Sequence, residues 1–277
     1  MTGARLHVSK AALLWAACLT TACGTPLMKL PGGPGTPATD GATALAEATA
    51  ACRDIDTITL EMSVHGSAHG RRLRGRLTAG LAKPASARLE AVASFGQPLF
   101  VFVARNDDAS LLLPRDGRVL EHGKPEDVLE AVAGVPIDAA SLRSILVGCT
   151  RSASRGASGL ADVRSLGEAW RVAGDESDTV YFKHATPPGR WRLVATVRPP
   201  GQSGTGWRAE YSMFDDNLPR KVHLVSEPSG RFDLELELSQ VEVNVALGPE
   251  AFQLQQTGAA TPITLDELRQ SGPLGEK

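Results

Sequence analysis

The chain has few aromatic residues and no excess of charge of either sign. Phenylalanine, tryptophan and tyrosine make up 5% of its 277 residues, and its formal net charge at pH 7 is −2. Nucleic-acid binding usually needs a basic face, so this balance argues against a nucleic-acid partner. The hydrophobic fraction of 42% is nevertheless enough for a substantial core.

The chain also lacks a hydrophobic run that could cross a membrane as a helix, which needs about 20 apolar residues. A shorter apolar run, residues 11–19, follows the basic residues Arg5 and Lys10 and precedes Thr20-Thr21-Ala22. A charged start, a short apolar stretch and a small residue before the cut are typical of a secretory signal. We therefore expect residues 1–22 to be removed as a signal peptide.

Cysteine is scarce, and position accounts for two of the four cysteines. Cys18 would leave with the signal, and Cys23 lies at the predicted cleavage site. Cys52 and Cys149 remain as an even pair in an exported chain, where disulfides persist. We expect these two to be bridged, and two separate buried thiols are the alternative.

The predicted cleavage site resembles the signal of a bacterial lipoprotein, which ends in a lipidated cysteine. Ala22-Cys23 fits this pattern, whereas Thr20 stands where an aliphatic residue is usual. The resemblance implies that Cys23 carries acyl groups such as palmitate, and cleavage to a soluble secreted protein is the alternative. Residues 23–40 are rich in Gly, Pro and Thr, which predicts a flexible linker to the folded body.

Most of the remaining chain shows the alternation of apolar and polar residues that is typical of half-buried antiparallel strands. About eleven such strands, each with one apolar face, are expected to curl around a common interior. The segments are 57–64, 72–77, 87–94, 99–104, 110–113, 169–173, 179–183, 191–197, 206–214, 221–226 and 231–245.

Helices are predicted at two places. Asp40 is placed to cap a helix over residues 42–53. Residues 125–149 predict two short amphipathic helices, the first opened by Pro125 and the second capped by Asp138. We therefore predict one mainly β (α+β) domain over residues 41–277, an unclosed antiparallel half-barrel with an N-terminal helix and a helical lid at about 125–149.

No motif for catalysis or metal binding is recognisable, so we expect no cofactor, no metal site and no enzymatic activity. His65 and His69 are four residues apart, but Gly66 and Gly70 predict a hairpin there, and two histidines alone make a poor site. A hydrolase would need a Ser/His/Asp cluster that assembles only in three dimensions.

A row of arginines, Arg72, Arg74 and Arg76, shares one face of a predicted strand. The simpler interpretation is a solvated face whose charges limit aggregation. Contact with anionic lipid headgroups is the alternative.

The predicted half-barrel favours an apolar pocket for acyl chains, because a curved sheet of this size encloses more volume than a packed sandwich. A dry, packed core is the alternative. The candidate lining residues on the alternating strands are Leu60, Met62, Val64, Leu77, Leu89, Trp191, Leu193, Phe232, Leu234 and Leu236.

The order of elements, with the segments 95–100 and 111–114 and the pair Gly148-Cys149, resembles the LolB-like lipoproteins of the LolA/LolB superfamily. These are periplasmic lipoprotein carriers and receptors. The resemblance implies an unclosed, eleven-stranded barrel with a helical lid over nearly all of residues 41–265. It also implies that Leu99, after the short turn 96–98, is the residue that helps to transfer lipoproteins to a membrane.

The leading hypothesis is a monomeric, non-catalytic protein that binds the acyl chains of lipids or lipoproteins. It would be anchored through lipidated Cys23 in the outer membrane, facing the periplasm, and would receive its cargo from a periplasmic carrier protein. In this way it would help to localise lipoproteins or lipids at that membrane. The alternative is a structural or assembly lipoprotein that docks protein partners without a lipid ligand.

Overall fold

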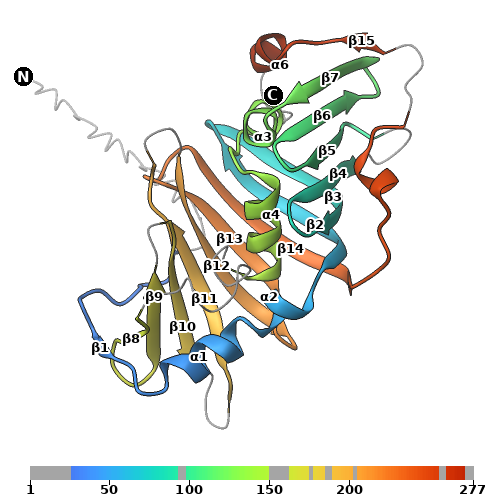
Figure 1. Ribbon diagram of the computed structural model, residues 1–277. Helices are drawn as coiled ribbons and strands as arrows, with labels where there is room; N and C mark the ends of the chain where they lie inside the picture. Colours follow the sequence, from blue (N-terminus) through green and yellow to red (C-terminus); the bar gives the residue numbers. More distant parts are fainter. Residues whose placement is uncertain are drawn as a thin grey trace, which may run out of the picture.

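A single, strongly curved sheet forms the body of the protein (Figure 1). The computed structural model describes residues 26–92, 98–149, 162–174, 177–184, 189–201, 205–255 and 260–271, without the side chain of Cys52. Its fifteen strands lie in the order β1-β8-β9-β10-β11-β12-β13-β14-β2-β3-β4-β5-β6-β7-β15. Neighbouring strands are antiparallel except β7 and β15, and β1 and β15 are the two edges of an open sheet.

The strands differ widely in length. The five longest are β2 (Thr57–Ala68), β3 (Arg71–Ala82), β12 (Gly206–Asp215), β13 (Leu218–Glu227) and β14 (Phe232–Val243). Those of intermediate length are β4 (Ser86–Val92), β5 (Val101–Arg105), β6 (Asp108–Leu113), β7 (Arg118–Gly123), β9 (Trp170–Gly174), β10 (Thr179–His184) and β11 (Trp191–Arg198). Three have two residues each, namely β1 (Thr36–Pro37), β8 (Arg164–Ser165) and β15 (Thr261–Pro262).

The open half-barrel is confirmed, but the predicted number of about eleven strands is wrong. Each of the eleven segments forms a strand in its described part, and β7 and the three two-residue strands are additional. In β7 the successive residues Val119 and Leu120 are both buried, and the pairing with β6 shifts register between Ala109 and Leu111. This irregularity hides the alternation of β7, and a two-residue strand is too short to show any period.

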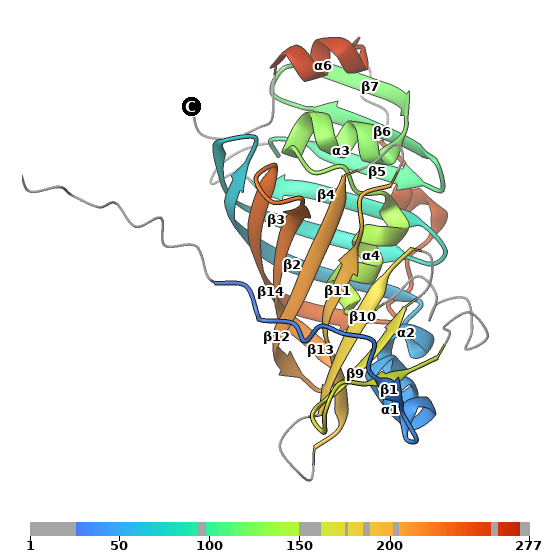
Figure 2. The same cartoon turned by 90° about the vertical axis from the view of Figure 1, so that its left-hand side faces the viewer.

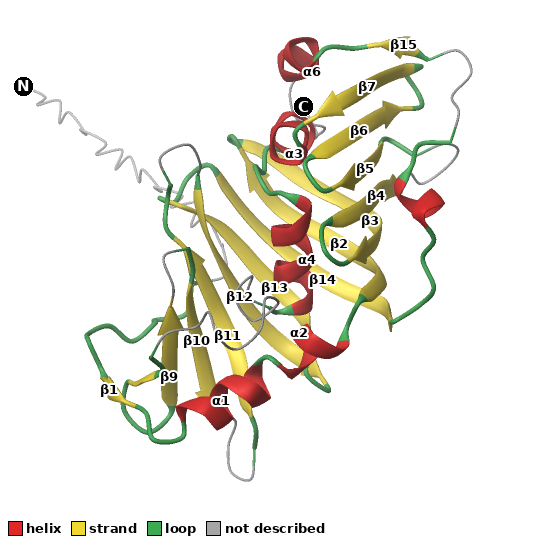
Figure 3. Cartoon of the chain, viewed as in Figure 1, coloured by secondary structure: helices red, strands yellow, loops and turns green. Residues whose placement is uncertain are grey.

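The helices lie mainly on the concave face of the sheet (Figure 3). The predicted helix over residues 42–53 is broken at Thr49 into α1 (Gly41–Ala48) and α2 (Ala50–Asp54). The predicted lid contains α3 (Pro125–Ala133) and α4 (Ala139–Val147), and α4 packs on β3, β4 and β13. The chain ends with a 3₁₀ turn, η2 (Pro249–Phe252), and with α6 (Leu265–Ser271), which packs on α3.

The N-terminal segment, residues 26–40, lies along the outer face of the sheet near β9–β12 (Figure 2). The backbone N–H of Met28 donates to both carboxylate oxygens of Glu210, at 2.9 and 3.0 Å, and Arg208 donates to the carbonyl of Met28. Further along, the Ala38 N–H donates to the carbonyl of Val163 at 2.9 Å. The composition of residues 23–40 predicts a flexible linker, whereas its described part makes defined contacts with the body.

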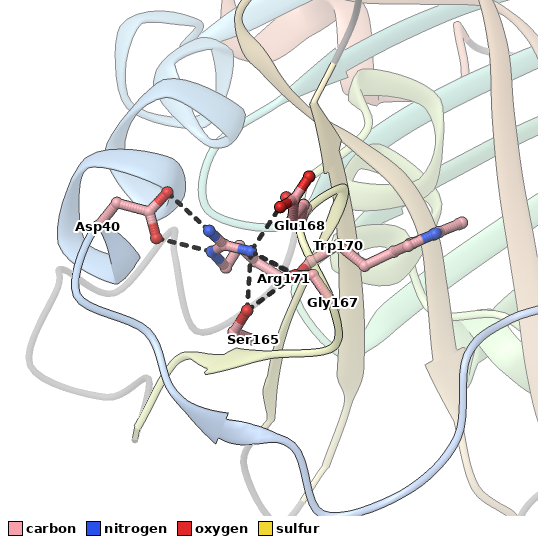
Figure 4. Close-up of polar contacts among 6 residues, drawn as sticks. All are labelled: Asp40, Ser165, Gly167, Glu168, Trp170 and Arg171. Atoms are coloured by element: carbon pink, nitrogen blue, oxygen red, sulfur yellow. Dashed lines mark hydrogen bonds and ion pairs between the residues drawn. The ribbon is translucent and has the colours of Figure 1, made fainter.

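Asp40 does not cap α1 through its side chain, as the sequence predicts, but forms an ion pair with Arg171 (Figure 4). The two carboxylate oxygens accept from the Arg171 guanidinium at 2.7 and 3.0 Å. Arg171 also donates to Ser165 Oγ at 3.0 Å and lies over the Trp191 ring, 4.6 Å from its centroid. The pair therefore fastens the start of α1 to β9, and the hydrogen bond from Arg171 lowers the pKa of Asp40 below its ordinary value.

We expect Asp40→Asn to lower the free energy of unfolding at pH 7 by up to about 1 kcal/mol, the range of partly exposed ion pairs. A carboxyl group with a lowered folded-state pKa stabilises the fold above its unfolded pKa. This contribution is lost as the pH falls through the folded pKa. Urea unfolding of both proteins at pH 7 and at about pH 3 should therefore show a smaller difference at the lower pH.

Asp107→Asn is a suitable control, because Asp107 is exposed and has no ion pair among the described residues. A cost of Asp40→Asn that is equally large at both pH values would contradict the assignment of its effect to the ion pair.

Candidate functional site

An apolar cavity of about 160 Å³ lies between the inner face of the sheet and the two inserted helices. One wall is formed by side chains of β2, β3, β4, β13 and β14 and by the residues that lead into β5. The opposite wall is formed by α3, α4 and the segment that joins them. The cavity is therefore where the predicted half-barrel and the predicted lid meet.

The structure brings six of the ten predicted lining residues together in this cavity. The four others, Leu60, Trp191, Leu193 and Phe232, are buried in the packed core, each at most 6% exposed. Trp191 and Leu193 belong to β11, whose main helix contact is with α1, and the backbone N–H of Trp191 donates to a carboxylate oxygen of Glu47 on α1. The six that line the cavity are Met62, Val64, Leu77, Leu89, Leu234 and Leu236.

The lid itself contributes lining residues that are not among the ten predicted from the strands. Leu129 and Val132 come from α3, Ile137 from the connecting segment and Leu142 from α4. The helical spacing of Leu129 and Val132 indicates an apolar face of α3, and this pattern could have identified them once the helix was placed over the sheet.

Gly75 is a further lining residue that the sequence did not single out. It lies on β3 beside the cavity, and a Cβ atom added there would have no heavy atom within 4 Å. Its backbone does not have the left-handed conformation that disfavours other residues. The position can therefore accept a side chain, and that side chain would project into the free space.

The mouth of the cavity carries exposed apolar and basic side chains. Val92 is 48% exposed, and Leu99, the predicted transfer residue, is 39% exposed. Leu99 continues the β4–β5 hairpin, because its N–H donates to the carbonyl of Ala91 at 3.0 Å. The turn before it, residues 96–98, lies outside the described residues except for its last one. Arg74 and Arg76 complete the rim and are both exposed.

Helix α4 is fastened at its N-terminus by a buried polar network. Asp138 caps the helix as predicted, accepting from the Ser141 N–H at 2.8 Å and from the Ser141 hydroxyl at 2.7 Å. Arg198 of β11 donates to the same hydroxyl at 2.8 Å and forms a two-bond ion pair with Asp178, which is 3% exposed.

The remainder of α4 is fastened as well. Arg143 is buried and donates to the carbonyl of Ile55, and burial lowers the pKa of Arg143 below its ordinary value. Cys149, two residues after the helix, is buried and disulfide-bonded. The side chain of Cys52 lies outside the described ones, so its pairing with Cys149 stays a prediction.

Helix α3 is held by apolar packing and by exposed ion pairs. Its inner residues Val128 and Val132 are fully buried. On its outer side Glu130 pairs with Arg231 at 3.1 Å, and Asp127 approaches Arg269 of α6 at 3.6 Å. The helix ends at Gly134 in the left-handed conformation that favours glycine.

The described residues show no metal-binding cluster of three or more His, Cys, Asp or Glu side chains. His65 lies on β2 and His69 in the tight turn to β3, in the hairpin predicted from the flanking glycines. No helix in the described part of the chain is long and apolar enough to cross a membrane.

No protein-family model matches the chain, and no curated protein sequence is significantly similar to it. Solved structures are similar in fold. A LolA superfamily protein from Nitrosomonas europaea is 11% identical with a TM-score of 0.52, over 77% of this chain and 97% of that one.

Two other solved structures are more distant. A domain described as an outer membrane lipoprotein-sorting protein from Vibrio parahaemolyticus is 15% identical with a TM-score of 0.43, over 73% of this chain and 92% of that one. Lipoprotein LppX from Mycobacterium tuberculosis is 11% identical with a TM-score of 0.32, over 73% and 96%.

Identities this low show the fold alone, and the likeness to the Nitrosomonas protein extends over almost its whole length. The chain has the fold of a LolA superfamily protein.

Proposed function

We propose that the protein binds the acyl chains of lipids or lipoproteins without catalysing a reaction, and that it does so while anchored to a membrane. The apolar cavity beneath the inserted helices is the observation that carries this proposal. The fold supports it, because the similar structure from Nitrosomonas belongs to a superfamily of lipoprotein carriers and receptors. The anchor would be lipidated Cys23, which lies outside the described residues, in the outer membrane and facing the periplasm.

The size of the cavity implies that binding requires movement. A cavity of about 150 Å³ is enough for a benzene molecule, whereas pockets for larger ligands range from about 300 to 1,000 Å³. The present volume of about 160 Å³ would therefore accept only the end of an acyl chain. Each further methylene that leaves water contributes about 0.8 kcal/mol, which is the free energy available to displace the lid.

The contacts of the two helices indicate which one moves. Displacing α4 would break the buried hydrogen bond from Arg143 to the carbonyl of Ile55 and the bond from Arg198 to the Ser141 hydroxyl, and a hydrogen bond to a charged group contributes about 1.5–3 kcal/mol. Displacing either helix would expose buried apolar side chains, such as Val128 and Val132 of α3. The polar contacts differ, because displacing α3 would break the exposed pairs of Glu130 and Asp127, which contribute about 0–1 kcal/mol each. We therefore expect α3 and the segment 134–137 to swing away while α4 remains in place. A ligand that binds only the open state shifts the population towards it.

The direct test uses a signal-free Cys23→Ala protein and mass spectrometry of the lipids extracted from it. Co-purified acyl lipids, or saturable binding of a fluorescent fatty acid, are expected. A purified protein that contains no lipid and does not bind the fatty acid would overturn the proposal. If such lipid-free protein co-purified with a stoichiometric protein partner, the assembly alternative would be favoured.

We expect Gly75→Leu to lower the affinity for the fluorescent fatty acid by about tenfold or more, because the new side chain fills space that the ligand needs. The free energy of unfolding should stay within about 1 kcal/mol of the wild-type value, since the site has room and the backbone is unstrained. Fluorescence titration and urea unfolding measure the two quantities.

Gly80→Leu is the matched control. Gly80 lies on the same strand outside the cavity, where a Cβ atom would meet only Leu247 Cδ1 at 3.8 Å. Unchanged affinity in Gly75→Leu, or an equal loss in both variants, would show that the ligand does not occupy this cavity.

We expect the double variant Asp127→Asn/Glu130→Gln to take up the fatty acid faster than the wild-type protein, because both ion pairs hold α3 in its closed position. Each lost pair should raise the uptake rate by up to about fivefold. Stopped-flow fluorescence measures the rate. Asp215→Asn is the control, since it removes an exposed pair with Arg220 at the β12–β13 turn. If the uptake rate rose equally in the double variant and in Asp215→Asn, or rose in neither protein, the result would argue against α3 as the moving element.

A further inference from the structure

The lining of the cavity contains only two charged residues among those described, and both are cations. Arg74 and Arg76 stand among apolar side chains and one glycine, and none of the described lining residues is acidic. A binding site for a purely hydrocarbon ligand has no need of charge. This arrangement instead fits a ligand with an apolar body and an anionic end.

The two arginines lie where the cavity meets solvent. The described pairing of β3 with β4 ends at Arg76 and Val92, so that Arg74 lies just beyond the paired region. The exposed Val92 and Leu99 lie at the same rim. A chain that enters here would leave its polar end beside the guanidinium groups.

The charges of Arg74 and Arg76 are not neutralised by the residues that the structure describes. Neither arginine has an ion pair there, in contrast to Arg88, Arg171 and Arg198 on other strands of the sheet. Their cross-strand neighbours on β2 are uncharged or weakly basic, Ser63 opposite Arg76 and His65 opposite Arg74.

The nearest acidic residues in the same rows are one strand further away, on β14. Glu237 is opposite Ser63, and Glu235 is opposite His65. Two strand spacings amount to about 10 Å, and Glu235 already pairs with Lys221 at 2.8 Å. Glu61 on β2 and Glu90 on β4 are diagonal neighbours of Arg76, and Glu90 already pairs with Arg88. Arg74 and Arg76 therefore outnumber the one acidic neighbour without an ion pair among the described residues, Glu61, beside an apolar opening.

The spacing of the two arginines suits a single anion. Residues two apart on a strand have Cα atoms about 6.6–6.8 Å apart and point to the same side. For Arg74 and Arg76 this is the face of β3 opposite to Gly75 and Leu77, and the two arginines border the cavity at the edge of β3 where its described pairing with β4 ends. Arginine side chains from such positions can converge on one phosphate, and their planar donor groups match its oxygens in pairs. Arg72 belongs to the same row but does not line the cavity. Arg72 is therefore a solvated arginine, which is the simpler interpretation of the row, whereas Arg74 and Arg76 lie at the mouth of the cavity.

We propose that Arg74 and Arg76 bind the phosphate headgroup of an amphiphile whose acyl chain enters the cavity. This inference rests on the proposed acyl-chain binding and names the class of ligand, an anionic phospholipid or its single-chain form.

The experiment compares palmitoyl lysophosphatidic acid with monopalmitoyl glycerol, which differ by the phosphate, in calorimetric titrations below the concentration at which either forms micelles. The wild-type protein should bind the phosphate-bearing lipid about tenfold more tightly, a preference that falls with added salt. The double variant Arg74→Gln/Arg76→Gln should lose this preference and keep its affinity for the neutral lipid. Arg72→Gln, the matched control on the same strand, should retain it.

The outcomes separate the two proposals. Binding of neither lipid would overturn the proposed function itself. Binding of both lipids with equal affinity, or a preference that survives in the double variant, would overturn the headgroup assignment alone.

Two further arms identify the source of the phosphate. Glycerol 3-phosphate, which has no acyl chain, should bind far more weakly than the lysolipid, and equal affinity would indicate a site for free phosphate instead. Cosedimentation with phosphatidylglycerol vesicles that depends on both arginines, while lysolipid binding does not, would assign them to membrane docking and overturn the headgroup site.

Discussion

The structure depends on one constraint, that the apolar inner face of an open, curved sheet must be removed from water. A sandwich would cover this face with a second sheet, whereas here helices cover it. Helix α4 covers the middle, and α1 covers β10 and β11. Helix α3 completes the cover only in part. The cavity is the space that remains where two short helices meet a sheet that is wider than they are.

The kind of contact that each covering helix makes determines what it can do. Seven of the nine residues of α4 are buried, including Arg143, and Arg198 ties its first turn to Asp178. Buried hydrogen bonds to arginine make a helix costly to move, because each is lost without a replacement partner. Helix α3 keeps its charges at the surface, where water replaces a lost partner at small cost. The same lid thus contains a fixed part and a part that can open.

Much of this fold follows from the sequence, because a period of two survives in every strand that has one solvated face. The strand β7 escaped prediction since Val119 and Leu120 are buried in succession. Alternation also identifies the face on which a residue lies, but not what covers that face. For this reason Met62 and Trp191 looked alike in the sequence, although one lines the cavity and the other packs near α1. The break at Thr49 and the docking of residues 26–40 depend on tertiary contacts that composition cannot report.

The docked N-terminal segment limits how far the predicted anchor can lie from the mouth of the cavity. Arg208, which binds the backbone of Met28, lies in the same row of the sheet as Arg72, beside the cavity mouth. The four strand spacings between them amount to about 19 Å, and the five residues from Met28 back to Cys23 span at most about 18 Å. A lipid on Cys23 would therefore hold the mouth of the cavity within a few tens of ångströms of the bilayer. The mouth lies at one end of the strands, where an acyl chain could pass between the bilayer and the cavity. The row that sets this distance runs through Arg208, Val225, Asp233, Ser67 and Arg72.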